Sequence, residues 1–225
     1  MDVLQNPKYF YLLGEQSFFY KIWKSLFYYY SKLVFTFYAP ITVHGRENIP
    51  NSSFIFSSNH NSHMDVALLS VASKKSFNYF GMLAAKDYWF DSKVKRFLVN
   101  TVMNLIPIDR KVDGIRKFPI EGTIKLCNAF MNHNQRNIII FPEGTRVEAG
   151  KVGNYARSSF ELAKRNNVKV LPICHNSGDC WPAHKFIKRP GTIKLFIGEP
   201  IKVVDSKKSA EEVRTWTEKN LNLSN

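Results

Sequence analysis

The chain has 225 residues, of which 44% are hydrophobic and 22% are charged, and this length and balance are typical of one folded domain. They exclude a disordered chain, a collagen-like chain and a small disulfide-rich scaffold. Lysine and arginine number 32 against 18 acidic residues, which gives a net charge of +14. Such a charge indicates an anionic partner, whether nucleic acid, a membrane surface or a phosphorylated substrate.

Aromatic residues crowd the N-terminal segment 9–38. Four charged residues interrupt this segment, namely Glu15, Lys21, Lys24 and Lys32. No apolar run is therefore long enough to span a membrane as a helix. Asp2 stands at the start of the chain and no small-residue cleavage site follows the aromatic stretch, so we also expect no signal peptide.

At helical spacing, this segment places apolar side chains on one stripe, made of Phe19, Ile22, Trp23, Leu26, Phe27 and Tyr30. The lysines lie mainly off the stripe, a pattern that suits the headgroup boundary of a lipid bilayer. We therefore expect residues 1–40 to form amphipathic, membrane-associating helices and residues 41–225 to form an α/β domain. The alternative is a helix whose apolar stripe packs on the protein's own core.

Beyond Pro40, short apolar runs alternate with helical patterns. Strands are expected at 41–44, 54–57, 138–141, 168–173 and 192–198, and two further apolar stretches lie at 77–85 and 105–108. Helices are expected from about Ser62, over 158–166 and over 209–220. This alternation indicates an α/β fold with parallel strand pairs covered on both faces. Functional sites in such sheets lie beyond the carboxyl ends of strands.

The sequence lacks the motifs of several common enzyme classes. It has no G-x-S-x-G nucleophile elbow, no glycine-rich nucleotide loop and no H-E-x-x-H metal motif. Its three cysteines, Cys127, Cys174 and Cys180, show no paired spacing. We interpret them as small buried residues rather than as disulfide partners or zinc ligands.

The first candidate site, residues 58–65 with the sequence S-N-H-N-S-H-M-D, follows a predicted strand. If Ser62 caps the next helix, Asp65 lies in its first turn and can reach back toward His60. A carboxylate on one imidazole nitrogen fixes the tautomer and leaves the other nitrogen free to accept a proton. This pair lacks an enzyme nucleophile, a role that a substrate hydroxyl could fill. The alternative is that Asp65 only caps the helix and His60 is a loop residue.

The second candidate site, residues 141–146 with the sequence F-P-E-G-T-R, follows the clearest predicted strand. Gly144 permits a tight turn. Glu143 can orient a donor or accept a hydrogen bond from a substrate hydroxyl, and the guanidinium of Arg146 matches phosphate oxygens.

A third segment, residues 106–111 with the sequence I-P-I-D-R-K, places Arg110 and Lys111 after another apolar run. Each arginine could by itself be a solvated surface charge. With the net charge of +14, an anion site at one edge of the sheet is the favoured interpretation. The histidines at 44, 133, 175 and 184 are isolated in the sequence and point to no site.

Together these segments resemble the 1-acylglycerol-3-phosphate (lysophosphatidic acid) acyltransferase family of PlsC-like glycerolipid acyltransferases. His60-x4-Asp65 matches the first family motif, H-x4-D, and residues 141–146 match the third, F-P-E-G-T-R, in full. Residues 170–173 fit the fourth motif, an apolar stretch around a proline. The resemblance extends from about residue 45 to residue 200.

The second family motif, often G-x-x-F-I-x-R, is kept only in part. Ile108 and Arg110 fit it, whereas Asn104 and Pro107 stand at the Gly and Phe positions. This departure leaves open an acceptor other than 1-acylglycerol-3-phosphate.

The resemblance implies a role for each matched residue. His60 would be the general base on the acceptor hydroxyl and Asp65 would orient it, so that the hydroxyl attacks an acyl thioester without an acyl-enzyme. Arg110 and Arg146 would bind the acceptor phosphate, and Glu143 its glycerol end. The other residues implied in substrate binding are Gly144, Thr145 and Lys86.

The resemblance also implies a mixed, largely parallel sheet flanked by helices. The implied reaction moves a fatty acyl group from acyl-CoA or acyl carrier protein to a lysophospholipid, first of all 1-acyl-sn-glycerol-3-phosphate, which would give phosphatidic acid. We expect no cofactor and no metal, membrane lipids rather than nucleic acid as partners, and a peripheral position on the cytoplasmic face of a membrane. The alternatives are another lyso-lipid acceptor, a non-catalytic basic membrane-binding module, or a nucleic-acid binder that relies on charge alone.

Overall fold

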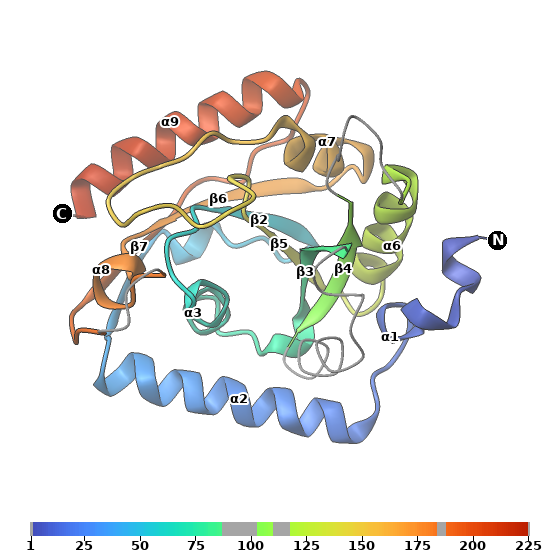
Figure 1. Cartoon of the computed structure of the whole chain (residues 1–225), viewed down its shortest axis with the longest axis horizontal. Coiled ribbons are helices and arrows are strands. Elements are labelled where there is room, and N and C mark those ends of the chain that lie inside the picture. Colours follow the sequence, from blue (N-terminus) through green and yellow to red (C-terminus); the bar gives the residue numbers. More distant parts are fainter. Residues whose placement is uncertain (1, 87–102, 110–117, 184–187, 225) are drawn as a thin grey trace.

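The computed structural model describes residues 2–86, 103–109, 118–183 and 188–224. Within these ranges one seven-stranded sheet has the order β1-β7-β6-β2-β5-β3-β4, and helices cover both of its faces (Figure 1). The strands are β1 (Ile41–His44), β2 (Phe54–Ser58), β3 (Phe80–Ala85), β4 (Asn104–Ile108), β5 (Asn137–Ile140), β6 (Lys169–His175) and β7 (Ile193–Ile197).

Strand direction brings three loops to one edge of this sheet. The neighbouring strands pair in parallel, except that β6 and β7 are antiparallel. The carboxyl ends of β2, β5 and β6 therefore meet at the same edge. The predicted mixed, largely parallel α/β sheet is confirmed.

The helices of the described residues are α1 (Phe10–Leu13), α2 (Phe18–Phe37), α3 (Asp65–Ala72), α6 (Ile120–Asn132), α7 (Arg157–Arg165), α8 (Ser177–Cys180) and α9 (Ser206–Ser224). The side chains of β2 point alternately into two hydrophobic cores, one on each face of the sheet. Phe54 and Phe56 lie in the core beneath α2 and α3. Ile55 lies in the core beneath α1, α6, α7 and α9.

Two expectations about local structure need correction. The helix expected from about Ser62 begins at Asp65, with Met64 as its N-cap, because the backbone N–H groups of Asn61 and Ser62 turn back to bond the Asp65 carboxylate. The apolar stretch 77–85 begins with a short 3₁₀ turn, and its strand starts at Phe80. The helix α6 was not anticipated from the sequence.

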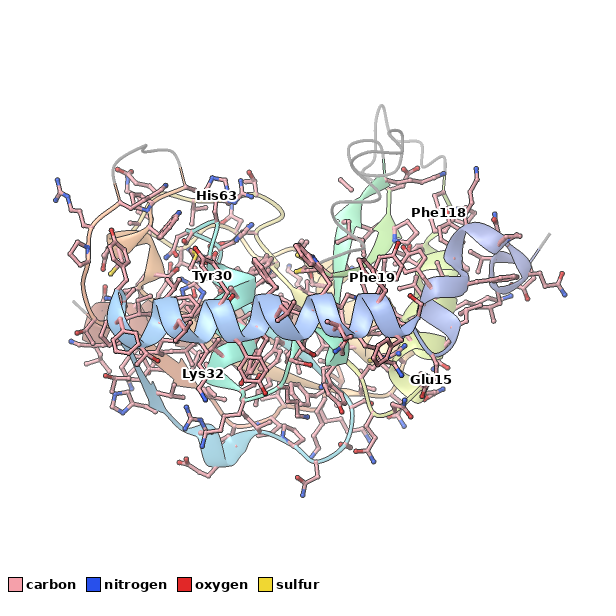
Figure 2. All side chains as sticks on the ribbon, turned by 90° about the horizontal axis from the view of Figure 1, so that it is seen from below. Glu15, Phe19, Tyr30, Lys32, His63 and Phe118 are labelled. Carbon is pink, nitrogen blue, oxygen red and sulfur yellow. The ribbon has the colours of Figure 1, made fainter. Side chains whose placement is uncertain are left out.

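The helix α2 leaves most of its predicted apolar stripe in solvent. Phe19, Ile22, Trp23, Leu26 and Tyr30 are between 43% and 69% exposed, whereas Phe27 packs against the core. In Figure 2, Phe19 and Tyr30 lie on the side of α2 nearer His63, and Lys32 lies on the opposite side. The stripe is therefore not the face that α2 packs on the protein's own core. No helix in the described ranges combines the length and the apolar character needed to cross a bilayer.

One lysine of α2 points into the protein rather than to solvent. Lys24 has no exposed surface, and its Nζ donates to Gln16 Oε1 at 2.7 Å and to Asn104 Oδ1 at 2.6 Å. Asn104 in turn donates to the carbonyl of Phe80 at 2.7 Å, so Lys24 ties α2 to the edge strand β4 and to its neighbour β3. Burial, together with the nearby Arg136, lowers the pKa of Lys24 to about 7.

Lys24 makes stability depend on pH. Between about pH 7 and its ordinary pKa of 10.5, the unfolded chain holds a proton that the folded protein has released, so the free energy of unfolding rises with pH. Lys24→Met should remove this rise, which amounts to at most about 5 kcal/mol. Urea unfolding between pH 6 and pH 10.5 measures it. The exposed Lys32→Met is the control on the same helix, and profiles for Lys24→Met and wild type that run parallel would contradict the assignment.

Candidate active site

The imidazole of His60 is bonded to the carboxylate of Asp65 at the carboxyl end of β2. The distance from His60 Nδ1 to Asp65 Oδ2 is 2.7 Å. The His60 side chain is 17% exposed and that of Asp65 is fully buried. The ring also stacks on Phe141, with centroids 3.9 Å apart. Because Nδ1 is occupied, Nε2 is the ring nitrogen left to exchange a proton with a substrate.

The carboxylate of Asp65 is held at both oxygens. Oδ2 accepts the backbone N–H groups of Asn61 and Ser62, each at 3.0 Å, and Oδ1 accepts the hydroxyl of Ser177 at 2.6 Å. Burial acts to raise the pKa of Asp65, but His175, His60 and Ser177 together bring it below its ordinary value. The group is therefore an ionised orienting partner for His60.

The end of β6 supplies residues that the sequence analysis missed. Ser177 Oγ lies 3.1 Å from His175 Nδ1, and His175 Nε2 lies 3.8 Å from Asp65 Oδ1. Burial lowers the pKa of His175, although Asp65 opposes this shift. The side chain of Asn59 exchanges two hydrogen bonds with the backbone of His175, at 2.8 and 3.1 Å. The feature of the sequence that could have pointed to these residues is their position shortly after the predicted strand 168–173.

Glu143 joins the loop after β5 to the loop that carries the histidine. Its Oε2 accepts the backbone N–H of His60 at 2.7 Å, and its Oε1 accepts that of Gly153 at 2.8 Å. The backbone N–H of Val147 also donates to the carbonyl of His60 at 2.8 Å. Burial raises the pKa of Glu143 to about 7, although the backbone N–H groups of Gly153 and His60 oppose the shift. Both oxygens of Glu143 thus position the backbone around His60.

The same loop continues with the turn residues Gly144 and Thr145 and with the positively charged Arg146. Gly144 has a φ of +70°, which lies in the left-handed region that favours glycine, and Thr145 is exposed. Arg146 is half-buried, and its Nε is buried without a hydrogen bond to any described residue. Burial and then Arg146 lower the pKa of His63, a shift that the bond from His63 to the carbonyl of Ala183 opposes.

Of the two further predicted binding residues, Arg110 lies outside the described residues, and Lys86 has its contacts elsewhere. Lys86 follows β3, and its Nζ lies 4.9 Å from the centroid of the Phe118 ring. It lines a cavity of about 440 Å³ together with the N-terminal residues Val3 and Tyr9. Among the described residues, no three His, Cys, Asp or Glu side chains form a group that could hold a metal ion.

The sequence and the fold match a known class of protein. The family model described as Acyltransferase matches residues 40–176, and the chain belongs to this family. The crystal structure of PlsC, the 1-acyl-sn-glycerophosphate (LPA) acyltransferase of Thermotoga maritima, has the same fold, with a TM-score of 0.68 at 22% identity. The match covers 90% of this chain and 80% of that one.

Curated relatives narrow the resemblance to one kind of acyltransferase. A 1-acyl-sn-glycerol-3-phosphate acyltransferase of Pseudomonas aeruginosa is 46% identical over 61 residues, which are 27% of this chain and 24% of the relative. A chloroplastic 1-acyl-sn-glycerol-3-phosphate acyltransferase of Arabidopsis thaliana is 27% identical over 192 residues, or 80% of this chain and 47% of the relative. The chain thus spans about half or less of the length of these relatives.

The hydroxyl of Ser177 should contribute measurably to stability. Ser177→Ala leaves the buried Oδ1 of Asp65 without the hydroxyl donor at 2.6 Å, whereas Asn61 Oδ1 keeps the backbone N–H of Gly178. The free energy of unfolding should therefore fall by about 1–3 kcal/mol. Ser57→Ala is the matched control, because Ser57 is also buried but its hydroxyl has no hydrogen bond to a described residue. That change should be neutral or stabilising. Equal losses in urea unfolding would show that the Ser177 bonds are not the cause.

Proposed function

We propose that the chain transfers a fatty acyl group from an acyl thioester to the free hydroxyl of 1-acyl-sn-glycerol-3-phosphate, giving phosphatidic acid. The observation that carries this proposal is the His60–Asp65 pair, in which a buried carboxylate orients an imidazole through Nδ1. The family membership and the names of the relatives support the same reaction.

In the proposed mechanism His60 Nε2 removes the proton of the acceptor hydroxyl as its oxygen attacks the thioester carbonyl. The new ester bond forms as the carbon–sulfur bond breaks, and the proton on His60 passes to the departing sulfur. Asp65 keeps the imidazole in the required tautomer and stabilises its positive charge. The acyl donor is acyl-CoA or acyl carrier protein, and no cofactor beyond this substrate takes part.

The proposed acceptor site uses the loop after β5. Arg146 would bind the acceptor phosphate, a role supported by the buried Nε that bonds no described residue. Arg110 would be a second phosphate ligand. Glu143 would support the glycerol end through the backbone that it holds, with Gly144 and Thr145 completing the turn.

Lys86 would take part at a distance from this group. Its cavity lies beside α6 and the N-terminal turns. The charged residues that line it are three lysines, Lys8, Lys86 and Lys125, against two acids, Asp2 and Glu121. This placement supports a contact with an anionic part of a substrate away from the reacting hydroxyl, rather than with the acceptor phosphate next to His60.

The protein would act at a membrane surface, as a peripheral enzyme on its cytoplasmic face. The exposed stripe of α2 supports this position, since Phe19, Trp23 and Tyr30 offer aromatic side chains to an interface. Segment 1–40 would be the membrane-associating part and 41–225 the catalytic α/β domain. The partners of the protein would be the lipid acceptor and the thioester donor, and the proposed reaction would contribute to phospholipid synthesis.

Removal of the base should abolish turnover while the fold survives. His60→Ala should lower kcat by roughly 10²–10⁴-fold, measured as thiol release from acyl-CoA in the presence of the lyso-lipid. His63→Ala is the control, because His63 lies in the same loop and bonds the carbonyl of Ala183 instead. Near-normal activity in His60→Ala, with circular dichroism unchanged, would refute the role. No thiol release by the wild type with any lyso-lipid would favour a non-catalytic membrane-binding module.

Loss of the loop arginine should affect one substrate more than the other. Arg146→Ala should raise the KM for the lyso-lipid phosphate at least tenfold, because one charge-assisted phosphate contact is lost, and should change the KM for the acyl donor much less. Steady-state kinetics with each substrate varied in turn measure both values. Equal increases in the two KM values would argue against a phosphate contact at Arg146.

A further inference from the structure

A second polar cavity lies beside α2, away from the histidine. Its volume is about 550 Å³, within the usual range for ligand sites. The residues that line it come from α2, from the turn after α3 and from the turn after α6, and they are Ser25, Tyr28, Tyr29, Lys74, Lys75, Ser76, Tyr79, Asn134 and Gln135. We call this cavity the tyrosine–lysine groove. The groove lies at the amino ends of β3 and β5, whereas His60 lies at the carboxyl end of β2.

The described lining of the groove carries two cations and no acid. Lys74 is exposed and Lys75 is half-buried. The Nζ of Lys75 lies 5.5 Å from the centroid of the Phe54 ring, and burial lowers the pKa of Lys75. The turn that presents both lysines is fixed by two hydrogen bonds between Ser70 and Lys75.

The groups next to the groove add to its positive potential. Arg136 follows the lining residue Gln135 and interacts electrostatically with Tyr79. It is 5% exposed, and its Nη1 is buried without a hydrogen bond to a described residue. The neighbouring carboxylate, Glu15, is already paired with Lys21. Hydroxyl groups of serine and tyrosine supply neutral donors that suit phosphate and glycerol oxygens.

The groove borders the exposed stripe of α2. Tyr29 lines the groove, is 61% exposed and directly precedes Tyr30 of the stripe. Lys32 lies one turn beyond Tyr28 and Tyr29 on this flank, opposite the side that carries Phe19 and Tyr30 in Figure 2. If the stripe rests in the acyl boundary, this flank lies at the level of the lipid headgroups.

We propose that the tyrosine–lysine groove binds the phosphate-bearing headgroup of an anionic phospholipid in the membrane, as a site separate from the one that holds the acceptor. This inference rests on the proposed membrane position of α2. Lys74 and Lys75 attract the net negative charge of an anionic lipid, whereas the ammonium group of a zwitterionic lipid cancels the charge of its phosphodiester. The site would keep the stripe of α2 against anionic regions of the bilayer, where the protein meets its substrate.

The test is vesicle co-sedimentation of the full chain with phosphatidylcholine vesicles that contain or lack phosphatidylglycerol. Lys74→Gln/Lys75→Gln should weaken binding to the anionic vesicles by about tenfold or more, since each lysine at an anionic surface contributes about fivefold. It should leave binding to pure phosphatidylcholine unchanged. The matched control is Lys207→Gln/Lys208→Gln, which removes the same charge from exposed positions on α9, over the other face of the sheet.

Each other outcome has a defined meaning. Equal losses of binding in the two double variants would show that only the overall charge matters, and would overturn the site. Displacement of the vesicles by millimolar glycerol phosphate would also overturn it, because the groove would then be a site for free phosphate. Loss of thiol release with detergent-dispersed substrates would place the lysines in the catalytic machinery instead. Leu26→Glu should weaken binding to both kinds of vesicle. If it does not, the membrane position of α2 is wrong, whatever the reaction that the site catalyses.

Discussion

The buried carboxylate of Asp65 is the group around which the site is organised. An ionised carboxylate without exposure costs several kcal/mol unless hydrogen bonds and charges replace its water. Here the replacement comes from the turn before α3, from His60 and from Ser177. The same bonds fix the imidazole, close the turn and join the ends of β2 and β6. The position of the His60 imidazole is therefore a consequence of satisfying one buried charge.

A second carboxylate extends this arrangement to the third loop. Glu143 holds the backbone of His60 and that of Gly153, so the loop after β5 and the loop that carries His60 are tied together. The two sequence motifs lie about eighty residues apart in the chain but form one hydrogen-bonded unit. This explains how Arg146, three residues after Glu143, is placed relative to a histidine that follows another strand.

The sequence predicted the strands well because each is a short apolar run whose alternate residues enter two cores, as Phe54 and Ile55 do. The spacing of His60 and Asp65 permitted a bond between them, with a helix cap as the alternative, and the structure shows the bond. The roles of Ser177 and His175 were not predicted, because they depend on β6 lying beside β2, which no local pattern specifies. The burial of Lys24 was not predicted for a related reason: a lysine in an amphipathic pattern normally faces solvent, and only the tertiary position of Asn104 shows its buried acceptor.

The bond between Lys24 and Asn104 also limits how this chain could have diverged from its relatives. Asn104 occupies the place where the family often has glycine, and a glycine there would leave an ammonium group in an apolar interior with one acceptor fewer. An apolar residue at 24 would in turn leave the Asn104 oxygen with the amide of Gln16 but without the lysine. The effects of substitutions at the two positions on stability should therefore be coupled rather than additive.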